Sequence, residues 1–248
     1  MEKEKVEFED VLKLYNKGLT DEEIAEVLEC SHQHIKRIRL SNGLKREEAK
    51  RPNNYKYSNI EYQVILGTVL GDGHLARQHK NGGVVLSISH CERQKEYIEW
   101  KREFLKENSC EVRKEWCHDA RFKNPDYVRY SFYTYSSTDL IDFYNRWYLP
   151  KKTICKEDFE KIEPLGLAIW YMDDGHKCVD GGCVLCTNSF SLEELHMVQE
   201  VLKNKFDIDT TIWESCNEPY IPAKSYQKFK DLIYPYINEV KCMQYKLE

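Results

Sequence analysis

The sequence lacks several features that define other classes of protein. No apolar run among its 248 residues approaches the roughly 20 residues that cross a membrane, and no signal peptide is recognisable. We therefore expect a cytoplasmic protein, or one of a host organelle or nucleoid, that is not secreted and has no membrane partner. Without secretory features, the ten cysteines are not expected to form disulfides.

A complete zinc-binding pattern is also missing. His176, Cys178, Cys183 and Cys186 could together furnish four ligands, and the C-x₂-C spacing of the last two is a known half-site. Only one such pair exists, however, and the residues between its cysteines suggest a strand, on which residues three apart point to opposite faces. We expect inert or partly buried thiols and no structural zinc.

The basic excess that is usual for a nucleic-acid-binding protein is absent as well. The chain has 37 Lys and Arg against 42 Asp and Glu, a formal net charge of −5. The charges are unevenly distributed, because residues 31–46 contain five basic residues and no acid, whereas residues 21–29 contain five acids and no base. This polarity indicates one face that contacts phosphate.

The most informative feature that is present is a pattern that occurs twice. Residues 65–73, ILGTVLGDG, and residues 167–175, LAIWYMDDG, are apolar runs that end in an acid and a glycine. They lie about one hundred residues apart, the length of a repeated half-domain. Apolar residues at nearly every position predict two helices that are buried on most of their circumference.

Small residues indicate how the two predicted helices meet. Gly67 and Gly71 are four apart, so they share a face and allow another backbone to approach closely. The natural partner is the second run, which has Ile169 and Asp173 at the equivalent positions and must rely on Ala168 for the contact. We therefore predict Gly67, Gly71 and Ala168 at the interface of paired helices.

The paired helices would bring two carboxylates together. Asp72 and Asp174 each precede the final glycine, and they would repel each other by about 3 kcal/mol at about 6 Å with an effective dielectric near 20. Divalent cations relieve this repulsion, and two oxygen-ligated ions that flank a scissile phosphate are a route to its hydrolysis. The candidate metal-binding positions are Asp72, Asp174 and the residues before them, Gly71 and Asp173; register favours Asp174 over Asp173. The alternative is that Asp-Gly merely caps a buried helix.

At these residues the chain resembles the LAGLIDADG homing endonucleases, specifically the monomeric two-motif kind. The resemblance implies an α+β fold of two pseudo-symmetric αββαββα repeats packed through the motif helices. It extends to residues 186–208, where Ser191 and Glu194 have capping-box spacing, and to residues 225–237.

The same resemblance implies two active-site lysines. LPKKTI, residues 149–154, is similar to the segment between repeats in which the family places an active-site lysine. By position this lysine is Lys152, and its counterpart in the second half is Lys246. A lysine beside the metals can stabilise the charge that grows on phosphate or orient the attacking water.

The first 48 residues predict a separate three-helix module. A helix from Phe8 to Tyr15 stops at Gly18, a second runs to Leu28, and Ser31 can cap a third. This order resembles the compact resolvase-like and homeodomain-like helix-turn-helix modules, in which the third helix enters the major groove. A three-helix interaction domain without DNA contact is the alternative. The candidate DNA contacts are Ser31, His32, Gln33, Lys36, Arg37 and Arg39.

Residues 49–57 are polar and predict a linker, followed by a catalytic body over residues 58–248 with repeats at about 58–150 and 151–248. For the first repeat we predict strands over 73–77, 84–91, 111–117 and 127–135, with helices over 93–108 and 138–148. Alternation leaves one face of each antiparallel sheet free to lie along DNA. The candidate contacts on the sheets are Arg77, His79, Arg113, Arg121, Arg129, His176, Lys177, Asn188, Thr211 and Trp213.

Together these features predict a site-specific endonuclease that cuts double-stranded DNA at a long asymmetric site. Asp72 and Asp174 would coordinate Mg²⁺ or Mn²⁺, and no dimer is needed because both halves are on one chain. The resemblance implies association with a mobile intron, an intein or a free-standing gene. Two alternatives stay open: a cleavage-inactive splicing cofactor, or maturase, that binds structured intron RNA, and a DNA-binding transcriptional regulator on a LAGLIDADG scaffold.

Overall fold

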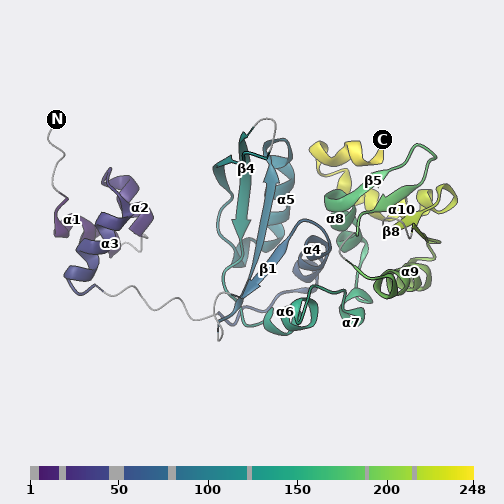
Figure 1. Cartoon of the computed structure of the whole chain (residues 1–248), viewed down its shortest axis with the longest axis horizontal. Coiled ribbons are helices and arrows are strands. Elements are labelled where there is room, and N and C mark those ends of the chain that lie inside the picture. Colours follow the sequence, from purple (N-terminus) through teal and green to yellow (C-terminus); the bar gives the residue numbers. More distant parts are fainter. Residues whose placement is uncertain are drawn as a thin grey trace. The chain divides into compact units, whose positions relative to one another are not determined.

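The computed structural model describes residues 6–16, 21–44, 53–77, 82–121, 125–187, 190–213 and 217–248. The chain divides into two compact units, Met1–Arg51 and Pro52–Glu248, and each is described by itself (Figure 1). Among the described helices, none is long and apolar enough to cross a membrane.

The first unit contains three short helices. They are α1 (Phe8–Tyr15), α2 (Asp21–Val27) and α3 (His32–Ser41). The hydroxyl of Ser31 accepts a hydrogen bond from the backbone N–H of His34 at 3.3 Å, so Ser31 caps α3 as the sequence predicts. A small core joins the helices and consists of Val11, Ile24, Ala25 and Ile35.

The first half of the second unit begins with a deeply buried helix. A capping box between Ser58 and Glu61 starts α4 (Asn59–Leu70). The elements that follow are β1 (His74–Arg77), β2 (Val84–Cys91), α5 (Lys95–Leu105), β3 (Arg113–His118), β4 (Asp126–Tyr133) and α6 (Ile141–Tyr148). The strands form an antiparallel sheet in the order β1-β2-β4-β3.

The second half repeats this order with shorter strands. Its elements are α7 (Lys156–Phe159), α8 (Pro164–Asp174), β5 (Gly175–Lys177), β6 (Cys183–Leu185), α9 (Leu192–Phe206), β7 (Thr211–Trp213), β8 (Glu218–Ile221), α10 (Ala223–Ile237) and the 3₁₀ segment η3 (Lys241–Leu247). The sheet has the order β5-β6-β8-β7, which matches the first sheet. The predicted α+β fold of two similar halves is thereby confirmed.

Helices α4 and α8 pack side by side between the two sheets (Figure 1). Equivalent residues of the two motifs meet: a Cβ built on Gly67 would lie 2.9 Å from Cβ of Ile169, and one built on Gly71 would lie 2.8 Å from Oδ2 of Asp173. Both glycines therefore make room for the larger residue of the other copy.

One detail of this interface corrects the sequence analysis. Ala168 is buried, but the main chain that approaches Gly67 most closely is that of Gly166. The structure thus places a second glycine, two residues before Ala168, where the two backbones come together.

The segment before α4 is part of the second unit. The Tyr55 hydroxyl donates to Oε1 of Glu61 at 2.7 Å, and the backbone N–H of Tyr57 donates to Oδ2 of Asp139 at 3.2 Å. Asn53 pairs with Ser137 in a β-bridge. The described part of the expected linker, residues 53–57, is therefore hydrogen-bonded to the body that follows.

Candidate active site

Asp72 and Asp174 lie where the two motif helices end. Asp72 follows α4, and Asp174 is the last residue of α8. Burial raises the pKa of Asp174 to about 6, with the nearby charges of Asp72 and Asp173 as further causes. Partial burial and the charge of Asp173 also raise the pKa of Asp72. The structure therefore brings the two motif carboxylates into one electrostatically coupled site.

Lys152 and Lys246 flank these carboxylates. Lys152 and Asp174 line the same cavity of about 260 Å³, together with Gly71. The ammonium group of Lys246 donates to the carbonyl oxygen of Gly175 at 2.7 Å, just beyond the end of α8. Burial lowers the pKa of both lysines, and the charges of Asp72 and Asp174 oppose this effect. Two cationic groups thus stand beside the two acids.

Asp173, the other acid of the second motif, has a different environment. Its side chain is completely buried and accepts hydrogen bonds from Nζ of Lys101 at 2.7 Å and 2.8 Å and from the Tyr97 hydroxyl at 2.8 Å. The backbone N–H of Asp72 lies 3.3 Å from its Oδ2. Lys101 is also fully buried, so the two opposite charges form an internal ion pair that links α5 to the end of α8.

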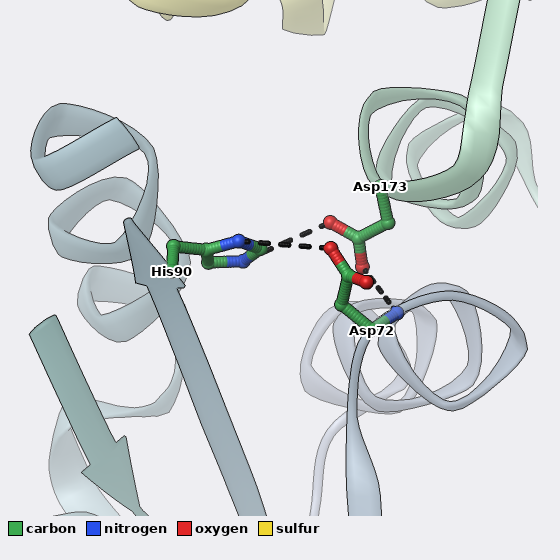
Figure 2. A group of neighbouring side chains, drawn as sticks. All are labelled: Asp72, His90 and Asp173. Carbon is green, nitrogen blue, oxygen red and sulfur yellow. Dashed lines mark hydrogen bonds and ion pairs between the residues drawn. The ribbon is translucent and has the colours of Figure 1, made fainter. Parts of the chain in front are cut away.

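His90 completes this arrangement from β2 (Figure 2). Its Nε2 lies 3.2 Å from Nζ of Lys101, and its Nδ1 lies 3.7 Å from Oδ2 of Asp72. Burial, reinforced by the charge of Lys101, lowers the pKa of His90 to about 4, so the imidazole is neutral at neutral pH. Asp72, His90 and Asp173 each offer a ligand atom, and these atoms lie within 4.8 Å of one another.

Tyr97, Lys101 and His90 were missed by the sequence analysis because they lie outside both motifs. One signal could have found Lys101. It stands four residues after Tyr97 and four before Leu105, on the apolar face of α5, where a lysine is out of place unless it is paired.

In the first unit, most of the predicted DNA contacts are exposed on α3. These are Ser31, His32, Gln33, Lys36 and Arg37. Arg39 is a correction, since its side chain is 2% exposed and forms two hydrogen bonds of 2.9 Å with the carboxylate of Asp21. Its guanidinium group therefore connects α3 to α2 inside the domain and is not available to phosphate.

The register of the first sheet separates the predicted contacts. Arg113 pairs with Ser131, and Arg129 pairs with Cys91, all on the sheet face that is not covered by helices. Arg77 lies on the opposite face, because it alternates with His74 along β1 and shares its side with buried Leu75.

The loop that follows β3 contains Arg121. Its guanidinium group is bound to Asp119, with Nε 2.9 Å from Oδ1. His79 lies outside the described residues.

The second sheet shows the same division. His176 pairs with Val184 on β6, whose partner on β8 is Tyr220, and Thr211 is the other neighbour of Tyr220. Trp213 stacks on Tyr220 with ring centroids 4.9 Å apart, so these residues share a face.

Lys177 alternates to the other side of the second sheet, where its Nζ lies 3.5 Å from the carbonyl oxygen of Leu247. It therefore faces the C-terminal segment and does not lie with His176. Asn188 is not among the described residues.

The fold and site define a two-repeat protein with acidic ends on its paired central helices. Residues 62–229 match the model of the LAGLIDADG DNA endonuclease family, and the chain belongs to this family.

Individual relatives agree with this assignment. The chain is 28% identical over 202 residues to the cytochrome b mRNA maturase bI2 of Saccharomyces cerevisiae, covering 74% of this chain and 46% of the relative. It is 27% identical over 209 residues to the probable intron-encoded endonuclease 1 of Wickerhamomyces canadensis, covering 77% and 84%. The chain spans only about half the length, 46% to 47%, of the first curated relatives that it matches.

A solved structure has the same fold. The homing endonuclease I-WcaI, bound to its DNA recognition sequence, matches with a TM-score of 0.69 and 24% sequence identity, over 78% of this chain and 88% of that one.

Proposed function

We propose that the protein is a monomeric, site-specific endonuclease that hydrolyses both strands of a long, asymmetric DNA site. The observation that supports this most is the convergence of Asp72 and Asp174 at the ends of α4 and α8, with Lys152 and Lys246 beside them. The similarity to a probable intron-encoded endonuclease of Wickerhamomyces canadensis agrees with it.

The charges of the site fit divalent metal ions. The negative charge of Asp173 is compensated by Lys101, whereas Asp174 makes no side-chain hydrogen bond or ion pair within the described part of the chain. The side chain of Asp72 is 46% exposed, so its carboxylate is accessible to a metal ion from solvent. Carboxylate oxygens are the ligands that Mg²⁺ and Mn²⁺ prefer.

Asp72 and Asp174 would therefore hold the ions, and Gly71 can add only its main-chain carbonyl. Divalent ions at such a site activate water and neutralise the charge of the phosphate. Among the three carboxylates proposed as ligands, that of Asp173 is the least available to a metal ion, because it already accepts hydrogen bonds from Lys101 and Tyr97.

The two lysines supply positive charge in addition to that of the metal ions. The Nζ of Lys246 is fixed by the carbonyl oxygen of Gly175, and Lys152 lines the cavity beside Asp174. A positive group stabilises the transition state when it lies where negative charge develops on the phosphate. Such a fixed group requires little reorganisation during the reaction.

DNA would be bound by the two uncovered sheet faces and by α3. We propose that residues 1–48 form a helix-turn-helix module whose exposed α3 residues, Gln33, Lys36 and Arg37 among them, contact DNA. On the sheets, the register favours Arg113, Arg129, His176, Thr211 and Trp213.

A plasmid library with randomised inserts, incubated with the full chain and Mg²⁺, tests the proposal. We expect linear product from a subset of inserts, loss of product with EDTA, and loss of most of the cleavage rate for Asp72→Asn and Asp174→Asn, since each removes a metal ligand. His196→Leu, at an exposed position of α9, is the matched control. Absence of cleavage by the wild type with Mg²⁺ and Mn²⁺, or full activity of either Asn variant, would contradict the proposal.

The similarity to a maturase favours RNA splicing assistance as the second candidate. A competition experiment separates the two, with a structured intron transcript added to the cleavage reaction. A maturase is expected to bind the transcript more tightly than any duplex and to leave all library plasmids intact.

A further inference from the structure

The two halves of the active site are not equivalent, and the reason lies in the helix pair. Gly71 and Asp173 occupy the same position in the two motifs and face each other, and a side chain on Gly71 would collide with Asp173. Only one of the two halves can therefore place a side chain here. In this chain it is the second half, and its Asp173 reaches across to the backbone N–H of Asp72 in the first.

Asp173 organises a chain of contacts that leads to Asp72. The Lys101 ammonium group donates to both carboxylate oxygens of Asp173, and its third neighbour is Nε2 of His90 at 3.2 Å. An ammonium group has three donors and no acceptor. The Nε2 atom must therefore carry the lone pair, which leaves the proton of the neutral imidazole on Nδ1.

The protonated Nδ1 faces the motif carboxylate. It lies 3.7 Å from Oδ2 of Asp72, and His90 extends from β2 toward this group (Figure 2). This distance exceeds a direct N–H···O bond, and contacts between catalytic groups often shorten only in the complex with substrate. Lys101, Asp173 and the imidazole side chain are all buried, which fixes the direction of the donor.

The second half has no equivalent donor among its described residues. His74 and His176 are equivalent positions in the two halves, and their strand partners are Ser87 and Val184. His90 lies three residues after Ser87, and Thr187 lies three residues after Val184, so Thr187 is the counterpart of His90. Its hydroxyl donates to the carbonyl oxygen of Asn217, so its proton is not free for Asp174.

We propose that His90, held in its Nδ1-protonated form by Lys101 and Asp173, is a positioning residue for Asp72 alone. This inference rests on the proposed nuclease function. Groups that hydrogen-bond to metal-ligating carboxylates fix their orientation, and their loss lowers metal affinity or activity by roughly 10- to 100-fold. The first-half carboxylate is thus preorganised by a donor that no described residue of the second half supplies to Asp174, so the two DNA strands are cut by unequal halves.

The test measures each strand separately. A duplex recovered from the plasmid library is labelled on both strands and cleaved in single turnover by the full chain with Mg²⁺. His90→Leu is expected to slow one strand by roughly 10- to 100-fold and the other by much less, so that nicked duplex accumulates. His90→Asn retains a donor near the position of Nδ1 and should restore the strand ratio, and His196→Leu should leave both rates unchanged. Equal slowing of both strands by His90→Leu, or no restoration by Asn, would overturn the proposal.

A second measurement does not depend on cleavage. Long-range ¹H–¹⁵N NMR spectra of the uniformly labelled full chain report which imidazole nitrogen carries the proton, and the His90→Leu spectrum assigns the signal. We expect Nδ1–H at neutral pH. An Nε2–H form would overturn the positioning role whatever the cleavage data show, whereas Nδ1–H in a protein that cuts no plasmid would contradict the nuclease function only.

Discussion

Gly71 and Asp173 face each other across the paired motif helices, with room for only one side chain between them: a Cβ on Gly71 would lie 2.8 Å from the Asp173 carboxylate. The same relationship holds for Gly67 and Ile169. Residues at equivalent positions meet because the helices are related by approximate two-fold symmetry. The differences between the two motifs are therefore complementary, and each small residue in the first accommodates a larger one in the second.

Gly71→Ala tests this complementarity. Its methyl group would have to displace Asp173, and overpacking of this kind costs about 1–3 kcal/mol. We expect the free energy of unfolding, measured by urea denaturation, to fall by that amount. An unchanged urea midpoint with an unchanged slope would show that the interface can open without cost.

Lys101→Met tests the buried ion pair. Removal of one partner leaves the Asp173 carboxylate buried and uncompensated, which typically costs about 3–5 kcal/mol. The double variant Lys101→Met/Asp173→Ala removes both charges and should recover part of this loss. Urea denaturation measures both values.

The matched control is Lys95→Met on the same helix, where the lysine is half exposed and pairs with Glu99. Exposed pairs of this kind contribute little to stability, so the stability of this variant should stay near that of the wild type. A double variant that is no more stable than Lys101→Met would contradict the ion-pair interpretation.

The parts of the fold that sequence predicts well are those with local signals. The apolar runs mark α4 and α8, and the alternation of β2 gives its bounds, Val84–Cys91, as observed. Asp72 and Asp174 follow from the repeated motif in the same way.

The rest depends on contacts between distant segments. Nothing near Arg39 shows that it turns inward to meet Asp21, eighteen residues earlier. Lys101 and His90 gain their roles only when α5 and β2 approach Asp173. Strand register also decides that Arg77 and Lys177 share faces with buried residues, and a single residue of error in a strand reverses such an assignment.

Metal binding should depend on pH through Asp174. Its folded-state pKa of about 6 lies above the unfolded value near 3.9, so the folded state holds more protons between about pH 4 and 6, and metal-free stability falls as pH rises through this window. Mg²⁺ must displace the proton. We therefore expect the Mg²⁺-induced rise in Tm to be larger at pH 7 than at pH 5.

Asp174→Asn should remove this difference, while Asp231→Asn at an exposed position of α10 should keep it. The measurement is thermal unfolding with and without Mg²⁺ at both pH values. A Mg²⁺ effect of the same size at pH 5 and pH 7 in the wild type would contradict the assignment of Asp174 to the metal site.

The basic residues of α3 should separate into two classes. Lys36 and Arg37 are exposed, so Lys36→Ala and Arg37→Ala should each weaken binding to the selected duplex and reduce the slope of log K against log salt by about 1, without a change in stability. Arg39→Met should instead destabilise the first unit, because Asp21 loses its buried partner. Fluorescence anisotropy across a salt series, with Lys13→Ala on α1 as the control, measures the slopes. Slopes that stay at the wild-type value in both α3 variants would remove this helix from the DNA interface.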